Sequence, residues 1–226
     1  MNEQRRGRLI VFEGVEGAGK STQLERLAGH LARAGVPFRA FREPGGTALG
    51  DAIRRLLLDP AATMSARAEA LLFMASRAEL VARELRPALD AGTTVLLDRF
   101  FLSTYAYQVA GRGLAEDDVR SANLMATHGL VPELTVLLTL RAEIGLSRAA
   151  RRSGPDRIEQ SGREFHERVE RAFGEFATPA WQRTHEECGP IVAVNAGGDP
   201  GAVEALVLDA VTARFPELRA MLGAVA

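Results

Sequence analysis

The sequence has almost no lysine. Of its 28 basic residues, 27 are arginine, and the one lysine is Lys20. Proteins that switch on GTP read guanine with the sequence N-K-x-D, and no lysine other than Lys20 is present to form it. A GTP-dependent switch that signals through a partner is therefore excluded.

Cysteine, basic blocks and long apolar runs are scarce as well. Cys188 is the only cysteine, which excludes an internal disulfide and fits a reducing compartment. The net charge is −1 with both signs interspersed, which argues against nucleic-acid binding. The apolar run at residues 9–12 is too short for a signal sequence or a membrane span. We expect a cytoplasmic protein without a membrane or nucleic-acid partner.

What the chain does contain is a regular alternation of apolar runs and helical patterns. Its 226 residues, 46% of them hydrophobic, suffice for one domain with a full core. Strands are predicted at residues 8–13, 38–42, 93–97, 134–140 and 191–195. This order predicts an α/β fold, a five-stranded parallel sheet flanked by helices on both faces, with ligands at the carboxyl ends of the strands.

Helical spacing fills the segments between these strands. The first helix follows Lys20 and ends near Gly35, and another begins after the turn-rich residues 43–47. A long pattern runs over 65–90, where Pro87 is expected to kink or end the helix. Further helices are predicted at residues 102–110, 116–127, 143–152, 165–176 and 203–211.

A phosphate-binding loop lies between the first strand and the first helix. Residues 14–21 fit G-x-x-x-x-G-K-[ST], in which loop amides surround phosphate oxygens and the lysine reaches the β- and γ-phosphates. A lysine ammonium suits this place because it is compact, whereas a planar guanidinium would crowd the loop. The predicted ATP-binding residues are Gly14, Val15, Glu16, Gly17, Ala18, Gly19, Lys20, Ser21 and Thr22.

Two residues are candidates for holding Mg²⁺. The hydroxyl of Ser21 is the P-loop ligand for the ion that accompanies ATP. Asp98 ends an apolar strand, where a Walker-B carboxylate would lie. Many strands end in Asp because a turn or helix cap follows. Asp98 is therefore a candidate metal ligand only because a P-loop accompanies it.

Five segments, in order, resemble those of thymidylate kinases. They are Phe12 to Thr22, Arg42-Glu43-Pro44-Gly45-Gly46-Thr47, Leu72-Phe73 with Arg77, Asp98-Arg99 with Ser103, Thr104, Tyr107 and Gln108, and Asp156-Arg157-Ile158-Glu159. The resemblance spans about residues 8–195 and is closest to the bacterial form, whose P-loop carries an acid, here Glu16. It implies a P-loop kinase fold, ATP and dTMP as substrates with Mg²⁺, and a homodimer.

The resemblance also implies roles in binding dTMP. Phe73 would stack on thymine and Arg77 would reach a base carbonyl, although both could instead be core and surface residues of an amphipathic helix. Tyr107 would pack beneath the deoxyribose, and Glu16 would lie near the 3′-hydroxyl or the metal. The substrate-binding residues implied are Arg42, Pro44, Phe73, Arg77, Arg99, Ser103, Thr104, Tyr107 and Gln108.

A mobile lid is expected at about residues 150–160, where glycine and proline interrupt a cluster of arginines. Such a cluster is often only a solvated surface, and the family resemblance favours the lid. The catalytic residues implied are Lys20, Arg99, Glu16 and two lid arginines, Arg152 and Arg157.

Another P-loop nucleotide or deoxynucleoside kinase is the alternative. Arg42 and Arg99 favour an acceptor that already bears a phosphate, because a forked guanidinium suits phosphate oxygens. A nucleoside acceptor would instead require a carboxylate base at the end of the first strand, and Glu13 occupies that position.

Overall fold

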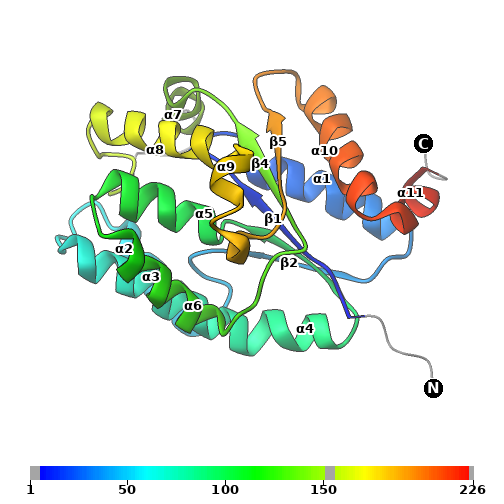
Figure 1. Ribbon diagram of the computed structural model, residues 1–226, viewed down its shortest axis with the longest axis horizontal. Coiled ribbons are helices and arrows are strands. Elements are labelled where there is room, and N and C mark those ends of the chain that lie inside the picture. Colours follow the sequence, from blue (N-terminus) through cyan, green and yellow to red (C-terminus); the bar gives the residue numbers. More distant parts are fainter. Residues whose placement is uncertain (1–5, 151–155, 224–226) are drawn as a thin grey trace.

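The computed structural model describes residues 6–150 and 156–223. Within them, five parallel strands form one sheet in the order β2-β3-β1-β4-β5 (Figure 1). The strands are β1 (Leu9–Glu13), β2 (Phe38–Arg42), β3 (Thr94–Asp98), β4 (Leu134–Thr139) and β5 (Ile191–Asn195). The predicted five-stranded parallel sheet is confirmed, and each strand lies within a residue or two of its predicted range.

Strand β1 lies at the centre of the sheet and of the core. Its neighbours are β3 and β4, and all five of its side chains are buried. A strand covered on both faces has no solvent side, which explains why Leu9–Glu13 is an unbroken apolar run that becomes polar only at its last residue. The carboxyl ends of β1 and β3 therefore open onto the same edge, where ligands bind in such sheets.

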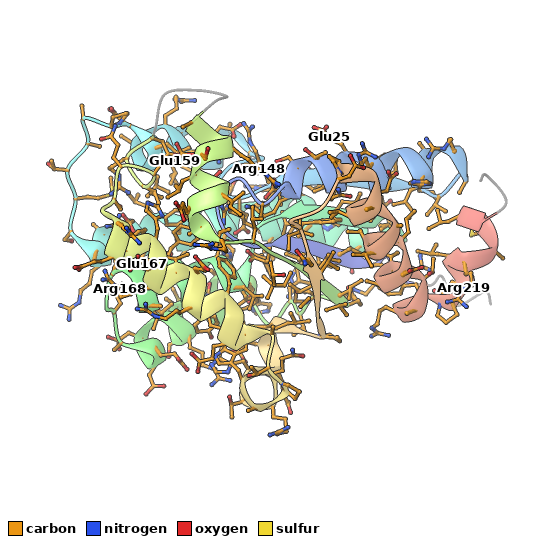
Figure 2. All side chains as sticks on the ribbon, turned by 90° about the horizontal axis from the view of Figure 1, so that it is seen from above. Glu25, Arg148, Glu159, Glu167, Arg168 and Arg219 are labelled. Atoms are coloured by element: carbon orange, nitrogen blue, oxygen red, sulfur yellow. The ribbon has the colours of Figure 1, made fainter. Side chains whose placement is uncertain are left out.

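Helices cover both faces of the sheet, as predicted (Figure 1). On one face α1 (Lys20–Arg33) packs against α10 (Pro200–Arg214), which is followed by α11 (Pro216–Gly223). The rest of the chain supplies α2 (Ala48–Leu58), α3 (Ala66–Leu80), α4 (Arg86–Asp90), α5 (Phe101–Thr104), α6 (Glu116–Thr127), α7 (Ala142–Ala150), α8 (Arg163–Phe176) and α9 (Pro179–Gln182). Side chains fill the space between these layers, while charged residues such as Glu25, Arg168 and Arg219 lie at the periphery (Figure 2).

The helix interrupted by Pro87 changes its winding before the proline. Helix α3 ends at Leu80, residues Val81–Leu85 form a π-helical segment, and Pro87 lies in the first turn of α4. Proline has no N–H and its ring clashes with the carbonyl four residues earlier, so a wider turn upstream accommodates it. The helix therefore does not end at Pro87 but continues to Asp90, and a π-helical turn precedes the proline.

Candidate active site

A cavity of about 460 Å³ opens at the carboxyl ends of β1 and β3. It is lined by residues from the P-loop, α2, α3 and the segment after β3. The predicted site residues in its wall are Glu16, Gly17, Gly19, Lys20, Ser21, Thr22, Arg42, Pro44, Phe73, Arg77, Asp98, Arg99, Ser103, Thr104, Tyr107 and Gln108. Gly14, Val15 and Ala18 belong to the same loop but are not part of this wall.

The shape of the P-loop requires glycine at Gly17, where a side chain would have no space. Gly17 has φ +68°, and a Cβ on it would lie 2.0 Å from the carbonyl oxygen of Gly145 in α7. In return, a Cβ on Gly145 would lie 2.0 Å from the carbonyl oxygen of Glu16. Two backbones thus meet where neither has a side chain, and Gly145 is a residue that the sequence pattern did not single out.

The loop ends where α1 begins, and the N-terminus of this helix is open to an anion. Gly19 precedes the helix with φ +93° and, having no side chain, leaves the first-turn amides uncapped. The first turn also carries no acidic residue. Unpaired N–H groups and the positive end of the helix dipole therefore meet at the cavity, an arrangement that binds phosphate.

Lys20 lies within the loop rather than in solvent. Its Nζ donates to the carbonyl oxygens of Gly14, at 3.1 Å, and Val15, at 2.9 Å, and only 6% of the residue is exposed. Burial, with the positive charge of Arg99 nearby, lowers the pKa of Lys20 to about 8. An anion bound beside the buried ammonium would stabilise its charged form, because the anion replaces the lost hydration.

Ser21, in the first turn of α1, contacts Asp98, the last residue of β3. The hydroxyl of Ser21 donates to Oδ2 of Asp98 at 2.6 Å. Within residues 6–150 and 156–223, no three His, Cys, Asp or Glu side chains gather to hold a metal ion. Mg²⁺ that travels with a triphosphate takes most of its ligands from phosphate and water, so one hydroxyl and one carboxylate fit that ion.

Arg99 directs its guanidinium at the P-loop from an unusual backbone conformation. Its φ is +74°, in the left-handed region that non-glycine residues rarely adopt. This turn after β3 brings its NH2 group to 2.7 Å from Oε2 of Glu16 and its NH1 group to 2.9 Å from the Ser103 hydroxyl. Burial acts to lower the pKa of Arg99, but the electrostatic interactions with Tyr107 and Glu16 outweigh burial and raise the pKa above its ordinary value. The guanidinium therefore stays charged.

Glu13 is buried behind the cavity wall and is already fully engaged. One oxygen accepts from the backbone N–H groups of Phe100, at 2.7 Å, and Ser103, at 3.1 Å. The other accepts from the Ser103 hydroxyl at 2.6 Å. These bonds hold the start of the segment after β3, and they remove Glu13 as the base that a nucleoside acceptor would require.

The two α3 residues predicted to read a base differ in how they meet the cavity. Phe73 lines it as a half-buried side chain outside the hydrophobic core, as a stacking surface would. Arg77 is 2% exposed, and its N–H groups bond to Glu43, Thr104, Asn123 and the carbonyl oxygen of Phe100. A bond from Arg77 to a base stays a prediction, and it would require sharing one of these donors.

Comparison with known proteins decides the family. The thymidylate kinase family model matches residues 12–187. The chain belongs to the thymidylate kinase family. It is 51% identical to a thymidylate kinase of Deinococcus radiodurans over 177 residues, which is 78% of this chain and 86% of the relative. A thymidylate kinase of a Synechococcus strain is 46% identical over 208 residues, 91% of this chain and 96% of that one.

A solved structure agrees with this assignment. The crystal structure of thymidylate kinase from Ehrlichia chaffeensis superposes with a TM-score of 0.72 at 25% identity, covering 91% of this chain and 99% of that one. The resemblance found in the sequence motifs is therefore confirmed at the level of family and fold. Across residues 6–150 and 156–223, no helix is long and apolar enough to span a membrane.

Arg54 is a cavity residue of this thymidylate kinase family member that no motif revealed. It lies on α2, lines the cavity and donates to the carbonyl oxygen of Pro44 at 3.1 Å. Burial lowers the pKa of Arg54, and the positive charges of Arg42 and Arg99 lower it further. Three positive charges thus lie at one wall of the cavity and repel one another. An anion bound among them would offset this repulsion. Only the contact of α2 with the loop that follows β2, which the sequence does not reveal, brings Arg54 there.

The lid residues are only partly described. Arg152 lies outside the described residues. Arg157 is described, but it is not part of the cavity wall: its guanidinium pairs with Glu69 at 2.7 Å and donates to the carbonyl oxygen of Leu57 at 2.8 Å. Its neighbours Asp156, Ile158 and Glu159 do line the cavity. A catalytic role for Arg157 stays a prediction that requires it to leave Glu69.

Proposed function

We propose that this protein transfers the γ-phosphoryl group of ATP to the 5′-phosphate of dTMP, releasing ADP and dTDP. The observation that carries this proposal is that one cavity holds both a P-loop lysine and three arginines, Arg42, Arg54 and Arg99, which come from β2, α2 and the turn after β3. An acceptor phosphate needs no general base, because its second pKa is about 6 and its oxygen is already deprotonated at neutral pH.

The donor half of the cavity would hold the triphosphate. The amides of the P-loop and of the first turn of α1 bind its oxygens, and Lys20 neutralises the β- and γ-phosphates. Ser21 and Asp98 would hold Mg²⁺, which supplies further neutralisation of the phosphate charge when bound. Binding of phosphate beside Lys20 favours its charged form and offsets its burial.

The acceptor half would hold dTMP. An oxygen of its 5′-phosphate forms a bond to the γ-phosphorus while the bond from that phosphorus to the bridging oxygen of ADP breaks. Both reactants are polyanions that repel each other, so catalysis consists of neutralising charge and holding them in line. Arg42, Arg54 and Arg99 provide the positive charge. Phe73 stacks on the base, Tyr107 fills the space below the sugar, and Glu16 lies where it can meet the 3′-hydroxyl.

A lid would complete the site. We assign it to residues 150–160, with Arg152 and Arg157 as the residues that reach the transferring phosphoryl group. Glycine and proline beside three arginines support this assignment, since a closing flap excludes water and adds charge where it develops. The lone cysteine supports a reducing compartment, and we place the reaction in the cytoplasm.

A turnover assay with different acceptors tests the proposal. The enzyme is mixed with ATP, Mg²⁺ and one of dTMP, thymidine or dCMP, and ADP is measured. We expect dTMP to be the preferred acceptor and thymidine to be inert, because the arginine wall needs a phosphate and Glu13 is engaged elsewhere. Phosphorylation of thymidine in preference to dTMP would favour the deoxynucleoside kinase alternative instead.

We also propose that the protein is a homodimer, formed through α2, α3 and α6. Helix α3 packs against both α2 and α6, and all three expose large apolar side chains. The exposed fractions are 56% for Leu56, 60% for Leu71 and 76% for Met125. A second copy presenting the same surface would cover these residues, as in a two-fold symmetric interface.

The dimer predicts a mass of two chains by light scattering after size-exclusion chromatography. Leu71→Arg should reduce it to the mass of one chain, because a charge would be buried at the interface. Leu206→Arg is the matched control, since Leu206 lies on α10 and is 46% exposed; it should remain a dimer. A single-chain mass for the unaltered protein at micromolar concentration would contradict the proposal.

A further inference from the structure

Glu69 is a buried carboxylate beside the predicted base pocket that no motif assigns. It lies on α3 one turn before Phe73 and two turns before Arg77, so all three occupy one face of the helix. Phe73 and Arg77 line the cavity, whereas Glu69 does not; it is 2% exposed. A buried carboxylate one layer behind a binding site needs partners that compensate for its lost hydration.

Those partners come from two segments, one with Gln108 and Arg112 and one with Arg157. The side-chain amide nitrogen of Gln108 donates to Oε1 of Glu69 at 2.9 Å. Arg112 donates to both carboxylate oxygens at 3.1 Å. Arg157 pairs with Oε2 at 2.7 Å. One carboxylate therefore joins α3 to the π-helical segment Tyr105–Gly111, which carries Gln108, and to Arg157 of the proposed lid.

The charge of Glu69 decides which way the Gln108 amide faces. Burial works to raise the pKa of Glu69, but hydrogen bonds from Arg112 and Gln108 outweigh it and hold the pKa below its ordinary value. An ionised carboxylate only accepts hydrogen bonds, so it must face the NH₂ group of Gln108. Gln108 is 2% exposed and lines the cavity, and with its nitrogen bonded to Glu69 the amide has its carbonyl oxygen as the acceptor for a ligand.

A fixed acceptor at this position selects among pyrimidines. Thymine carries a hydrogen on N3 and can donate to an amide oxygen, whereas N3 of cytosine is itself an acceptor. Two acceptors that face each other in a buried site both lack a hydrogen-bond partner. A buried site therefore strongly disfavours a ligand that presents an acceptor there. We propose that Glu69 is a positioning residue that fixes the Gln108 amide with its oxygen toward the base, and thereby favours 2,4-dioxopyrimidine nucleotides over cytosine nucleotides. This inference rests on the proposed function of the cavity.

The test compares kcat/KM for dTMP with kcat/KM for dCMP in Glu69→Gln. The new side chain can donate as well as accept, so the Gln108 amide can turn either way. We expect the dTMP-to-dCMP ratio to fall about tenfold or more, because one misdirected hydrogen bond then no longer penalises cytosine. Arg112→Lys is the matched control: it keeps a positive charge beside the same carboxylate and leaves the Gln108 contact, but loses the two hydrogen bonds of the guanidinium. Its melting temperature should fall and its ratio should stay as in the unaltered protein.

A second background shows whether Glu69 acts through Gln108. In Gln108→Ala, adding Glu69→Gln should leave the ratio unchanged, because the amide that it orients is gone. An unchanged ratio in Glu69→Gln alone, or an equal fall in Arg112→Lys, would overturn the inference. If Glu69→Gln does not fold, Glu69→Asp keeps the charge but withdraws it from Gln108, and an unchanged ratio there overturns the inference equally. Failure of the unaltered protein to phosphorylate dTMP would instead sink the proposed function.

Discussion

Replacing Lys20 with methionine is expected to lower kcat for dTMP phosphorylation about a thousandfold. Methionine keeps the length of the side chain and removes only its charge. The ammonium sits on the loop carbonyls of Gly14 and Val15, where the β- and γ-phosphates would lie. Because the ammonium is buried and its pKa is lowered to about 8, removing it also removes a desolvation cost, so the variant should stay folded.

Turnover and melting temperature, measured together, check this expectation. Near-normal turnover in a folded Lys20→Met protein would contradict the assignment of the donor site. Lys20 is the only lysine, so an amine-directed reagent has no other target except the α-amino group. ATP should protect Lys20 from the reagent, and dTMP alone should not, because the two substrates occupy different halves of the cavity.

Replacing Arg99 with lysine is expected to lower kcat/KM for dTMP about a hundredfold, with KM rising. The charge remains, but the planar fork that meets Glu16 and Ser103, and that would meet the acceptor phosphate, is lost. Lysine cannot make two parallel bonds to phosphate oxygens from this position. Steady-state kinetics with dTMP and with ATP as the varied substrates separate the effect on the acceptor from that on the donor.

Arg39→Lys is the matched control for this change. Arg39 lies on β2 three residues before Arg42, is half exposed and pairs with Glu84 away from the cavity. Its kinetics should match those of the unaltered protein. A rise in KM for ATP but not for dTMP in Arg99→Lys would contradict the placement of Arg99 at the acceptor.

The sequence predicted those features that depend on neighbouring residues. The buried strand Leu9–Glu13, the glycine loop and the start of α1 at Lys20 form one continuous stretch, so their roles follow from local rules of burial and backbone freedom. The apolar runs gave the other four strands in the same way. Asp98 ends β3 as its strand pattern predicts, and it lies beside Ser21 because parallel strands finish at one edge.

Features that depend on contacts between distant segments could not be predicted from the sequence. Arg54 belongs to an ordinary amphipathic helix, and only the packing of α2 brings it beside Arg42 and Arg99. Likewise, the motif that suggests a base contact for Arg77 does not reveal that four protein groups already occupy its donors. Long-range hydrogen bonds of this kind depend on side-chain directions that spacing along one helix does not fix.

A crystal structure with dTMP and a non-hydrolysable ATP analogue tests the central claim most directly, because the claim is a division of phosphates within one cavity. We expect the triphosphate on the P-loop with Lys20 beside its β- and γ-phosphates. We expect the dTMP phosphate within hydrogen-bond distance of Arg99 and the thymine ring against Phe73. A dTMP phosphate bound elsewhere, with the Arg42, Arg54 and Arg99 wall empty, would contradict the account.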